Sequence, residues 1–191
     1  RHGRLVLRHL LAPLALRLYL APVFILAGSN KLSHAEHLAP WFGSLGIPAP
    51  ELMVYIAGLT ELLGGIALLA GLAVRWVAIP LMFTMLVAAV TAHWEQGWHV
   101  LPETELTVPW EWRTDLIEEA NTRKDAARSL LREHGNYGWL TETGGITILK
   151  NGIEFAATYF IMLLALLYLG AGRFLSFDYW IARRWRTTEG C

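Results

Sequence analysis

Glu61 is the residue of this sequence whose position most clearly demands a chemical explanation. It lies about ten residues into an apolar stretch, residues 52–74, that is long enough to cross a lipid bilayer. A carboxylate near mid-membrane costs roughly 3 kcal/mol on insertion scales, so such groups usually face a partner or a water-filled cavity and mark a functional site. The sequence therefore predicts that Glu61 points inward and takes part in chemistry.

Other polar side chains recur where the remaining apolar stretches begin or end. Lys31 ends the first stretch, His93 ends the third, and Asn151 and Glu154 open the fourth. An ammonium, two carboxylates and an imidazole that exchanges protons near neutral pH could bind a quinone headgroup, relay protons or hold a small ligand. We therefore predict a polar pocket in the outer half of the membrane, formed by Lys31, Glu61, His93, Asn151, Glu154 and Arg17, with Glu61 and His93 as its catalytic candidates.

A simpler interpretation stays open for most of these residues. Lys31, His93 and Glu154 also fit ordinary helix-end groups at the membrane surface, where long side chains extend toward water. Arg17 shares a helical face with Lys31 but lies near the opposite boundary, so it also fits a membrane anchor.

A metal site is not predicted. His34 and His37 are three residues apart and are weak candidate ligands, since histidine suits copper, zinc or iron. Neither an HExxH motif nor a set of cysteines accompanies them, and the single cysteine, Cys191, is the last residue.

The elements that must position these residues are apolar helices. Of the 191 residues, 54% are hydrophobic and only 17% are charged, which favours a membrane protein, and no basic block suggests nucleic-acid binding. Lipid offers the backbone no hydrogen-bond partner, so each apolar segment must be helical. The sequence predicts an all-α integral membrane four-helix bundle with spans at about residues 14–32, 52–74, 76–94 and 152–170.

The distribution of Lys and Arg orients the predicted bundle. Basic residues precede the first span, occupy the turn at Arg75 and follow the fourth span, which places both termini in the cytoplasm. The outer loop 95–150 holds ten acidic residues against six Lys and Arg, and apolar residues recur at helical spacing over 114–134. We predict an extramembrane insertion with an amphipathic helix there, and a second amphipathic segment along the inner surface from Gly172.

Several short motifs follow one another in order along the chain. They are Phe24, Ala27, Gly28, Lys31 and Leu32; Trp41-Phe42, Leu45-Gly46-Ile47-Pro48 and Pro50; Glu61, Gly64, Gly65 and Gly71; His93; and Gly170-Ala171-Gly172-Arg173-Phe174-Leu175-Ser176-Phe177-Asp178. This ordered set resembles the DoxX family of small bacterial membrane proteins, which takes in the small subunit of thiosulfate:quinone oxidoreductase. The long insertion at 95–150 departs from the family pattern, whose third loop is short.

The resemblance implies a four-helix bundle, a bacterial inner-membrane location, with the insertion in the periplasm, and a link to redox metabolism. The leading hypothesis is an accessory subunit, without independent catalytic activity, of a larger membrane redox complex whose pocket binds quinone or lipid. One alternative is a quinone-coupled oxidoreductase subunit that uses Glu61 and His93 in proton transfer. A second is a small ligand carrier in which Arg17 and Lys31 line one pathway. The expected partners are membrane lipid and other membrane subunits, and quinone is the one candidate cofactor.

Overall fold

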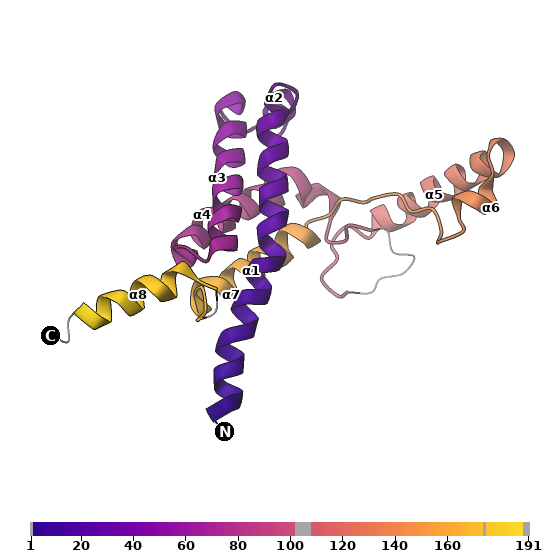
Figure 1. The fold of residues 1–191 in the computed structure, drawn as a ribbon. Coiled ribbons are helices and arrows are strands. Elements are labelled where there is room, and N and C mark those ends of the chain that lie inside the picture. Colours follow the sequence, from indigo (N-terminus) through magenta and orange to yellow (C-terminus); the bar gives the residue numbers. More distant parts are fainter. Residues whose placement is uncertain (1, 102–107, 174, 189–191) are drawn as a thin grey trace. The chain divides into compact units, whose positions relative to one another are not determined.

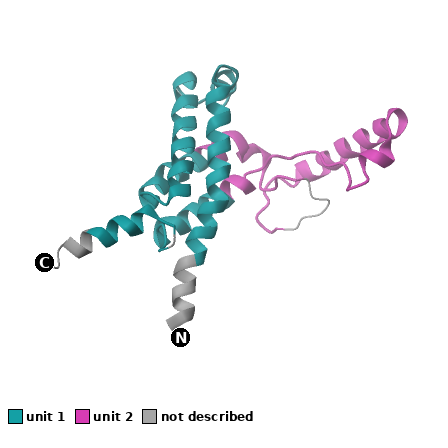
Figure 2. Cartoon of the chain, in the orientation of Figure 1, with its two compact units in different colours: residues 1–86, 158–191 teal, residues 87–157 magenta. Residues whose placement is uncertain are grey.

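A computed structural model of the chain describes residues 2–101, 108–173 and 175–188, with side chains described between residues 11 and 184. Arg1, Phe174 and Cys191, which figure in the sequence patterns above, lie outside the described residues. The residues that the structure describes form helices and no strands. The chain divides into unit 1, residues 1–86 and 158–191, and unit 2, residues 87–157 (Figure 2).

Three helices are long and apolar enough to cross a membrane. They lie at Leu11–Ser33, Pro50–Ala70 and Val74–Gln96, and they confirm the first three predicted spans as membrane-length apolar helices. The fourth predicted span, residues 152–170, contains a shorter apolar helix of 16 residues, α7 (Glu154–Leu169). Four complete spans therefore stay a prediction.

Within unit 1, α1 (His2–Ser33) and α3 (Pro50–Ala70) run side by side (Figure 1). Glycines make this contact possible: a Cβ at Gly28 would collide with the backbone of Leu62 and the carbonyl of Gly58, and one at Gly65 with the backbone of Ile25. Small residues at such positions let membrane helices approach closely.

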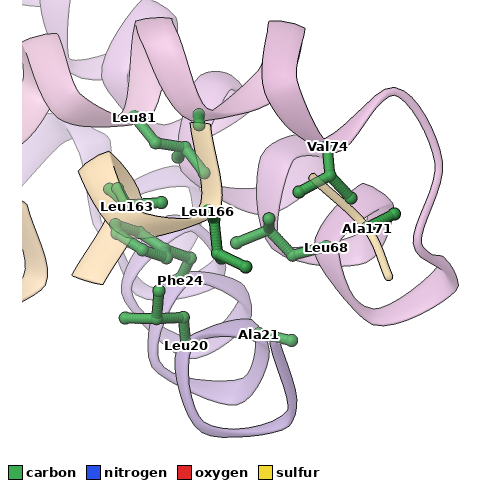
Figure 3. Close-up of a cluster of buried hydrophobic side chains, with 10 residues drawn as sticks. Leu20, Ala21, Phe24, Leu68, Val74, Leu81, Leu163, Leu166 and Ala171 are labelled. Atoms are coloured by element: carbon green, nitrogen blue, oxygen red, sulfur yellow. The ribbon is translucent and has the colours of Figure 1, made fainter. Parts of the chain in front are cut away.

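The main core of unit 1 is entirely aliphatic and aromatic. Figure 3 shows side chains from α1, α3, α4 (Val74–Ala88) and α7 packed together. The fully buried members are Leu20, Ala21, Phe24, Leu68, Val74, Ala78, Leu81, Leu163 and Leu166. A second cluster joins α2 (Ala35–Ser44) to α3 through Ala35, Ala39, Phe42 and Val54.

Two tight junctions shape the ends of these helices. Gly71 ends α3 in the left-handed conformation (φ 68°), which glycine adopts without steric cost, and α4 begins three residues later. The last turns after α4 are a π-helix at Ala89–His93 and a 3₁₀ turn at Trp94–Gln96. The π-turn adds a residue to the helical register over the stretch that ends at His93.

Unit 2 contains α5 (Asp115–His134) and α6 (Tyr137–Leu140). A helix thus occupies the stretch where apolar spacing predicted one. Ile117 and Ala120 of the predicted stripe are buried, whereas Leu130 is 59% exposed. The C-terminal helix α8 (Phe177–Thr188) belongs to unit 1.

Candidate functional site

The central feature of the candidate site is an ion pair between α1 and α3 in unit 1. Lys31 Nζ donates to Glu61 Oε2 at 2.7 Å. The Glu61 side chain is 4% exposed and that of Lys31 is 24% exposed. Both residues lie on helices of membrane length, so the pair is an opposite-charge contact within an apolar part of the chain.

The close packing of α1 on α3 explains why Lys31 reaches Glu61. Gly58 lies one turn before Glu61, and a Cβ there would touch the side chains of Leu32 and Lys31. The missing side chain leaves room for the Lys31 stem to lie against α3 while its ammonium extends to the carboxylate.

Arg17 contacts a different set of groups from Lys31. Arg17 is 1% exposed, and its guanidinium donates to four backbone carbonyls of the described residues, those of Leu68, Leu69, Ala171 and Leu175. Leu68 and Leu69 are in the last turn of α3, whose carbonyls have no partner within the helix. Lys31 lies fourteen positions after Arg17 in α1, which is about 20 Å along the helix axis.

The other predicted pocket residues belong to unit 2. His93 Nδ1 lies 2.8 Å from the carbonyl oxygen of Asn151, so Nδ1 carries the proton and donates. In the neutral ring, Nε2 is then the proton acceptor. Glu154 Oε2 accepts from the backbone N–H of Val100 at 3.1 Å.

A backbone ladder at the start of α7 holds these residues of unit 2. The N–H groups of residues 150–154 donate to the carbonyls of residues 97–100, with Gly152 to His99 at 2.9 Å and Glu154 to Trp98 at 3.0 Å. A Cβ at Gly152 would collide with these carbonyls, so glycine is required for the approach. The ladder supplies acceptors for amides that would otherwise be unpaired at the helix start.

A second buried ion pair, which the sequence analysis did not anticipate, lies in unit 2. Lys150 Nζ donates to Glu111 Oε2 at 2.7 Å, and the two side chains are 3% and 0% exposed. The Glu111 carboxylate also accepts from the backbone N–H groups of Trp98, His99 and Arg113. Glu111 lies between Trp110 and Trp112 in the sequence, but both of these side chains are exposed, so nothing in the sequence indicated the burial of Glu111.

These contacts set the protonation of Glu111. Burial of the carboxylate is the largest single influence and raises the pKa. The hydrogen bonds from Lys150 and from three backbone N–H groups outweigh burial and lower the pKa of Glu111 to about 2. Glu111 is therefore ionised at every physiological pH, which suits a structural role better than proton exchange.

The weak metal candidates are not part of a ligand cluster in the described residues. His34 and His37 are exposed, and His34 Nδ1 donates to the carbonyl of Asn30 at 3.1 Å. Among the residues with described side chains, no three His, Cys, Asp or Glu groups come together as a metal site would need.

Part of the first half of the chain is similar to known proteins. Residues 12–94 match the DoxX family model. A relative from Bacillus subtilis (strain 168), named "Putative oxidoreductase CatD", is 33% identical over 78 residues, which cover 41% of this chain and 57% of that protein. No solved structure matches the chain. The matched region contains the Lys31–Glu61 pair.

Proposed function

We propose that this chain is an accessory subunit of a larger membrane redox complex and that the Lys31–Glu61 pair is its site for a quinone or lipid headgroup. The observation that carries the proposal is the pair itself, buried between two helices of membrane length. Replacing a buried ion pair by apolar residues is often neutral or stabilising, so stability alone is a weak reason for its presence. A ligand that binds to both the ammonium and the carboxylate is a better reason for the presence of the pair.

The two groups offer complementary hydrogen bonds to such a ligand. The Lys31 ammonium has three donors and uses one on Glu61, so it can also donate to a quinone carbonyl oxygen or a headgroup phosphate. The Glu61 carboxylate can accept from the hydroxyl of a quinol. Because the charges of the pair cancel, a neutral ligand binds without leaving a net charge in the apolar region.

The accessory role is inferred from the redox-cofactor motifs that the sequence lacks. The sequence has no haem-ligand pattern and no flavin motif, so electrons would come from a partner or a soluble donor. The similarity to a protein named as an oxidoreductase supports the redox assignment. The expected partners are therefore membrane lipid and other subunits of a redox complex.

The same proposal includes a membrane arrangement. Four spans, with α7 as the fourth, would place both termini in the cytoplasm of a bacterial inner membrane and residues 95–150 outside it. The shared core of α1, α3, α4 and α7 supports a bundle of these four helices. The Lys and Arg at the chain ends and at Arg75 support the orientation.

The proposal is tested by assembly state and by quinone labelling in the same membranes. On blue native gels, the chain should migrate with partner proteins, well above its own mass of 21.4 kDa. A photoreactive quinone should label α1 or α3, and Glu61→Gln should lower labelling about ten-fold. Glu51→Gln is the matched control, because Glu51 is exposed in the first turn of the same helix. Migration as a lone chain, or equal labelling of both variants, would contradict the proposal.

A second candidate function is a quinone-coupled oxidoreductase subunit in which Glu61 and His93 move protons. The hydrogen bond from His93 Nδ1 to Asn151 favours it, because it leaves Nε2 as the acceptor of the neutral ring. With an added soluble electron acceptor to take up the two electrons, the purified chain without partner subunits should then oxidise a quinol, and both Glu61→Gln and His93→Gln should abolish turnover. The accessory role predicts no turnover without partners. The carrier alternative is disfavoured, since the guanidinium of Arg17 is occupied by backbone carbonyls.

A further inference from the structure

The start of α8 is held by a hydrogen-bonded junction with the turn between α3 and α4. Ser176 Oγ donates to the carbonyl of Gly71 at 3.2 Å, and the backbone N–H of Asp178 donates to the same carbonyl at 3.1 Å. The Asp178 carboxylate accepts from the N–H groups of Ala73 at 2.6 Å and Val74 at 3.1 Å. Asp178 thus caps the start of α4 while it belongs to the first turn of α8.

Arg17 closes this junction from α1. It donates to the carbonyl of Leu175 at 2.9 Å and to the carbonyl of Ala171 at 2.9 Å, on the segment that joins α7 to α8. A Cβ at Gly71 would collide with the Arg17 guanidinium, so glycine is needed at the centre of the junction. Because Pro50–Ala70 and Val74–Gln96 are consecutive helices of membrane length, the turn between them marks where the chain leaves the apolar layer. The junction therefore fixes α8 at that boundary.

The helix that leaves this junction carries an exposed apolar stripe. Phe177, Trp180 and Ile181 follow an i, i+3, i+4 spacing and are 59%, 59% and 47% exposed, and Leu175 just before them is 71% exposed. Exposing such a stripe to water is unfavourable. A helix that lies in the membrane interface buries a stripe of this kind in the boundary between the lipid headgroups and the acyl chains. Trp is also a residue that concentrates at the membrane–water boundary.

Cationic side chains lie beside these rings. Arg183 and Arg184 are exposed, and the Arg183 guanidinium lies over the Trp180 ring, 5.8 Å from its centroid. The first turn of α4 repeats the combination, with an exposed Arg75 next to Trp76, which is 78% exposed. Two segments that are about a hundred residues apart in sequence therefore present an arginine with a tryptophan in the same unit.

We propose that α8 lies in the plane of the membrane surface, with Phe177, Trp180 and Ile181 among the acyl chains and Arg183 and Arg184 on anionic phospholipid headgroups. Guanidinium groups bind phosphate through paired hydrogen bonds, and a basic interfacial segment is attracted to anionic lipid. The repeated pairing of Arg with Trp fits a lipid surface, since that surface offers an acyl layer and a charged layer along its whole extent. This inference does not depend on the redox function proposed above.

The test uses the full chain, with Cys191→Ser as background, reconstituted into vesicles. A bimane fluorophore is attached at Ile181→Cys, on the apolar stripe, or at Ala182→Cys, an exposed position on the opposite side of the helix. Brominated phosphatidylglycerol or brominated phosphatidylcholine, in equal fractions, serves as quencher. The label at 181 should be quenched more strongly than the label at 182, and more strongly by the phosphatidylglycerol.

The charge requirement is tested in the same assay. Each arginine near an anionic surface contributes about five-fold to the preference for it, so Arg183→Gln/Arg184→Gln should lower the preference for phosphatidylglycerol at least about five-fold. Arg123→Gln/Arg128→Gln on α5 removes the same charge from unit 2 and should leave the preference unchanged. Equal quenching of the two labels would overturn the in-plane placement. Equal quenching by the two lipids, or no quenching at either position, would overturn the anionic-lipid assignment.

Discussion

Two Lys–Glu pairs of the same length, one in each unit, differ sharply in their surroundings. In both, the ammonium lies 2.7 Å from a carboxylate oxygen. In the pair of unit 2, the Lys150 and Glu111 side chains are 3% and 0% exposed, and three backbone N–H groups also donate to Glu111. In the pair of unit 1, Lys31 is 24% exposed, and its hydrogen bond is the one found for Glu61 among the described residues.

The difference separates a structural pair from a candidate binding pair. A carboxylate has about four acceptor sites, and those of Glu111 are taken by the N–H groups of Trp98, His99 and Arg113 and by the Lys150 ammonium. Glu61 keeps acceptor capacity for a ligand, and Lys31 keeps donors. We therefore expect the two pairs to respond differently to the same substitutions.

The largest effect is expected from Lys150→Met. It leaves the Glu111 carboxylate buried without its cation, which typically costs about 3–5 kcal/mol. Faster hydrogen exchange at the amides of Trp98, His99 and Arg113 would report the local loss of structure. The double variant Glu111→Gln/Lys150→Met should recover much of the loss, because no unpaired charge stays behind.

A matched control for Lys150→Met is Arg123→Gln. Arg123 pairs with Glu119 on the exposed side of α5, with side chains 64% and 50% exposed. Exposed pairs contribute at most about 1 kcal/mol, so this variant should unfold almost like the parent. If Lys150→Met were equally mild, Glu111 would not be the structural centre of unit 2.

The second prediction concerns the stability of unit 2 at acidic pH. The lowered pKa of Glu111 determines whether that stability rises or falls with pH. The folded-state pKa of about 2 lies below the ordinary value of 4.5, so the stability that ionised Glu111 contributes is fully present above pH 4.5. That contribution is lost progressively as the pH falls from 4.5 toward 2. Hydrogen exchange in unit 2 should accelerate over this range in the parent. Glu111→Gln should remove most of that pH dependence, and an unchanged profile in this variant would contradict the assignment.

A smaller effect on stability is expected from Lys31→Met. Water can reach part of the Lys31 side chain, so the loss should be about 1–3 kcal/mol, less than at Lys150. Denaturant titration in detergent micelles measures it. Quinone labelling should nevertheless fall as far as in Glu61→Gln, because both groups serve the ligand. A loss of stability without any loss of labelling would make the unit 1 pair structural as well.

The sequence predicted the helical elements more completely than the contacts of their side chains. Hydropathy located the membrane-length helices within a few residues, since a run of about 20 apolar residues has one stable form in lipid. The motif from Gly170 to Asp178 was recognised as a pattern, but nothing in it revealed that Ser176 and Asp178 bond to the turn at Gly71–Val74. The π-turn at Ala89–His93 was also not predicted, because the prediction assumed the regular spacing of an α-helix.

Local patterns thus determined which segments are helices, that Glu61 is too costly to leave facing lipid, and which family the ordered motifs outside residues 95–150 resemble. The tertiary structure alone decided that Lys31 is the partner of Glu61, that Arg17 holds backbone carbonyls, and that Glu111 and Lys150 are buried together. The physical reason is the difference in sequence separation between the residues that interact in the two cases. Helix formation and membrane-length hydropathy depend on neighbours a few residues apart, whereas an ion pair depends on which segments pack closely enough to bring two charges within 3 Å of each other.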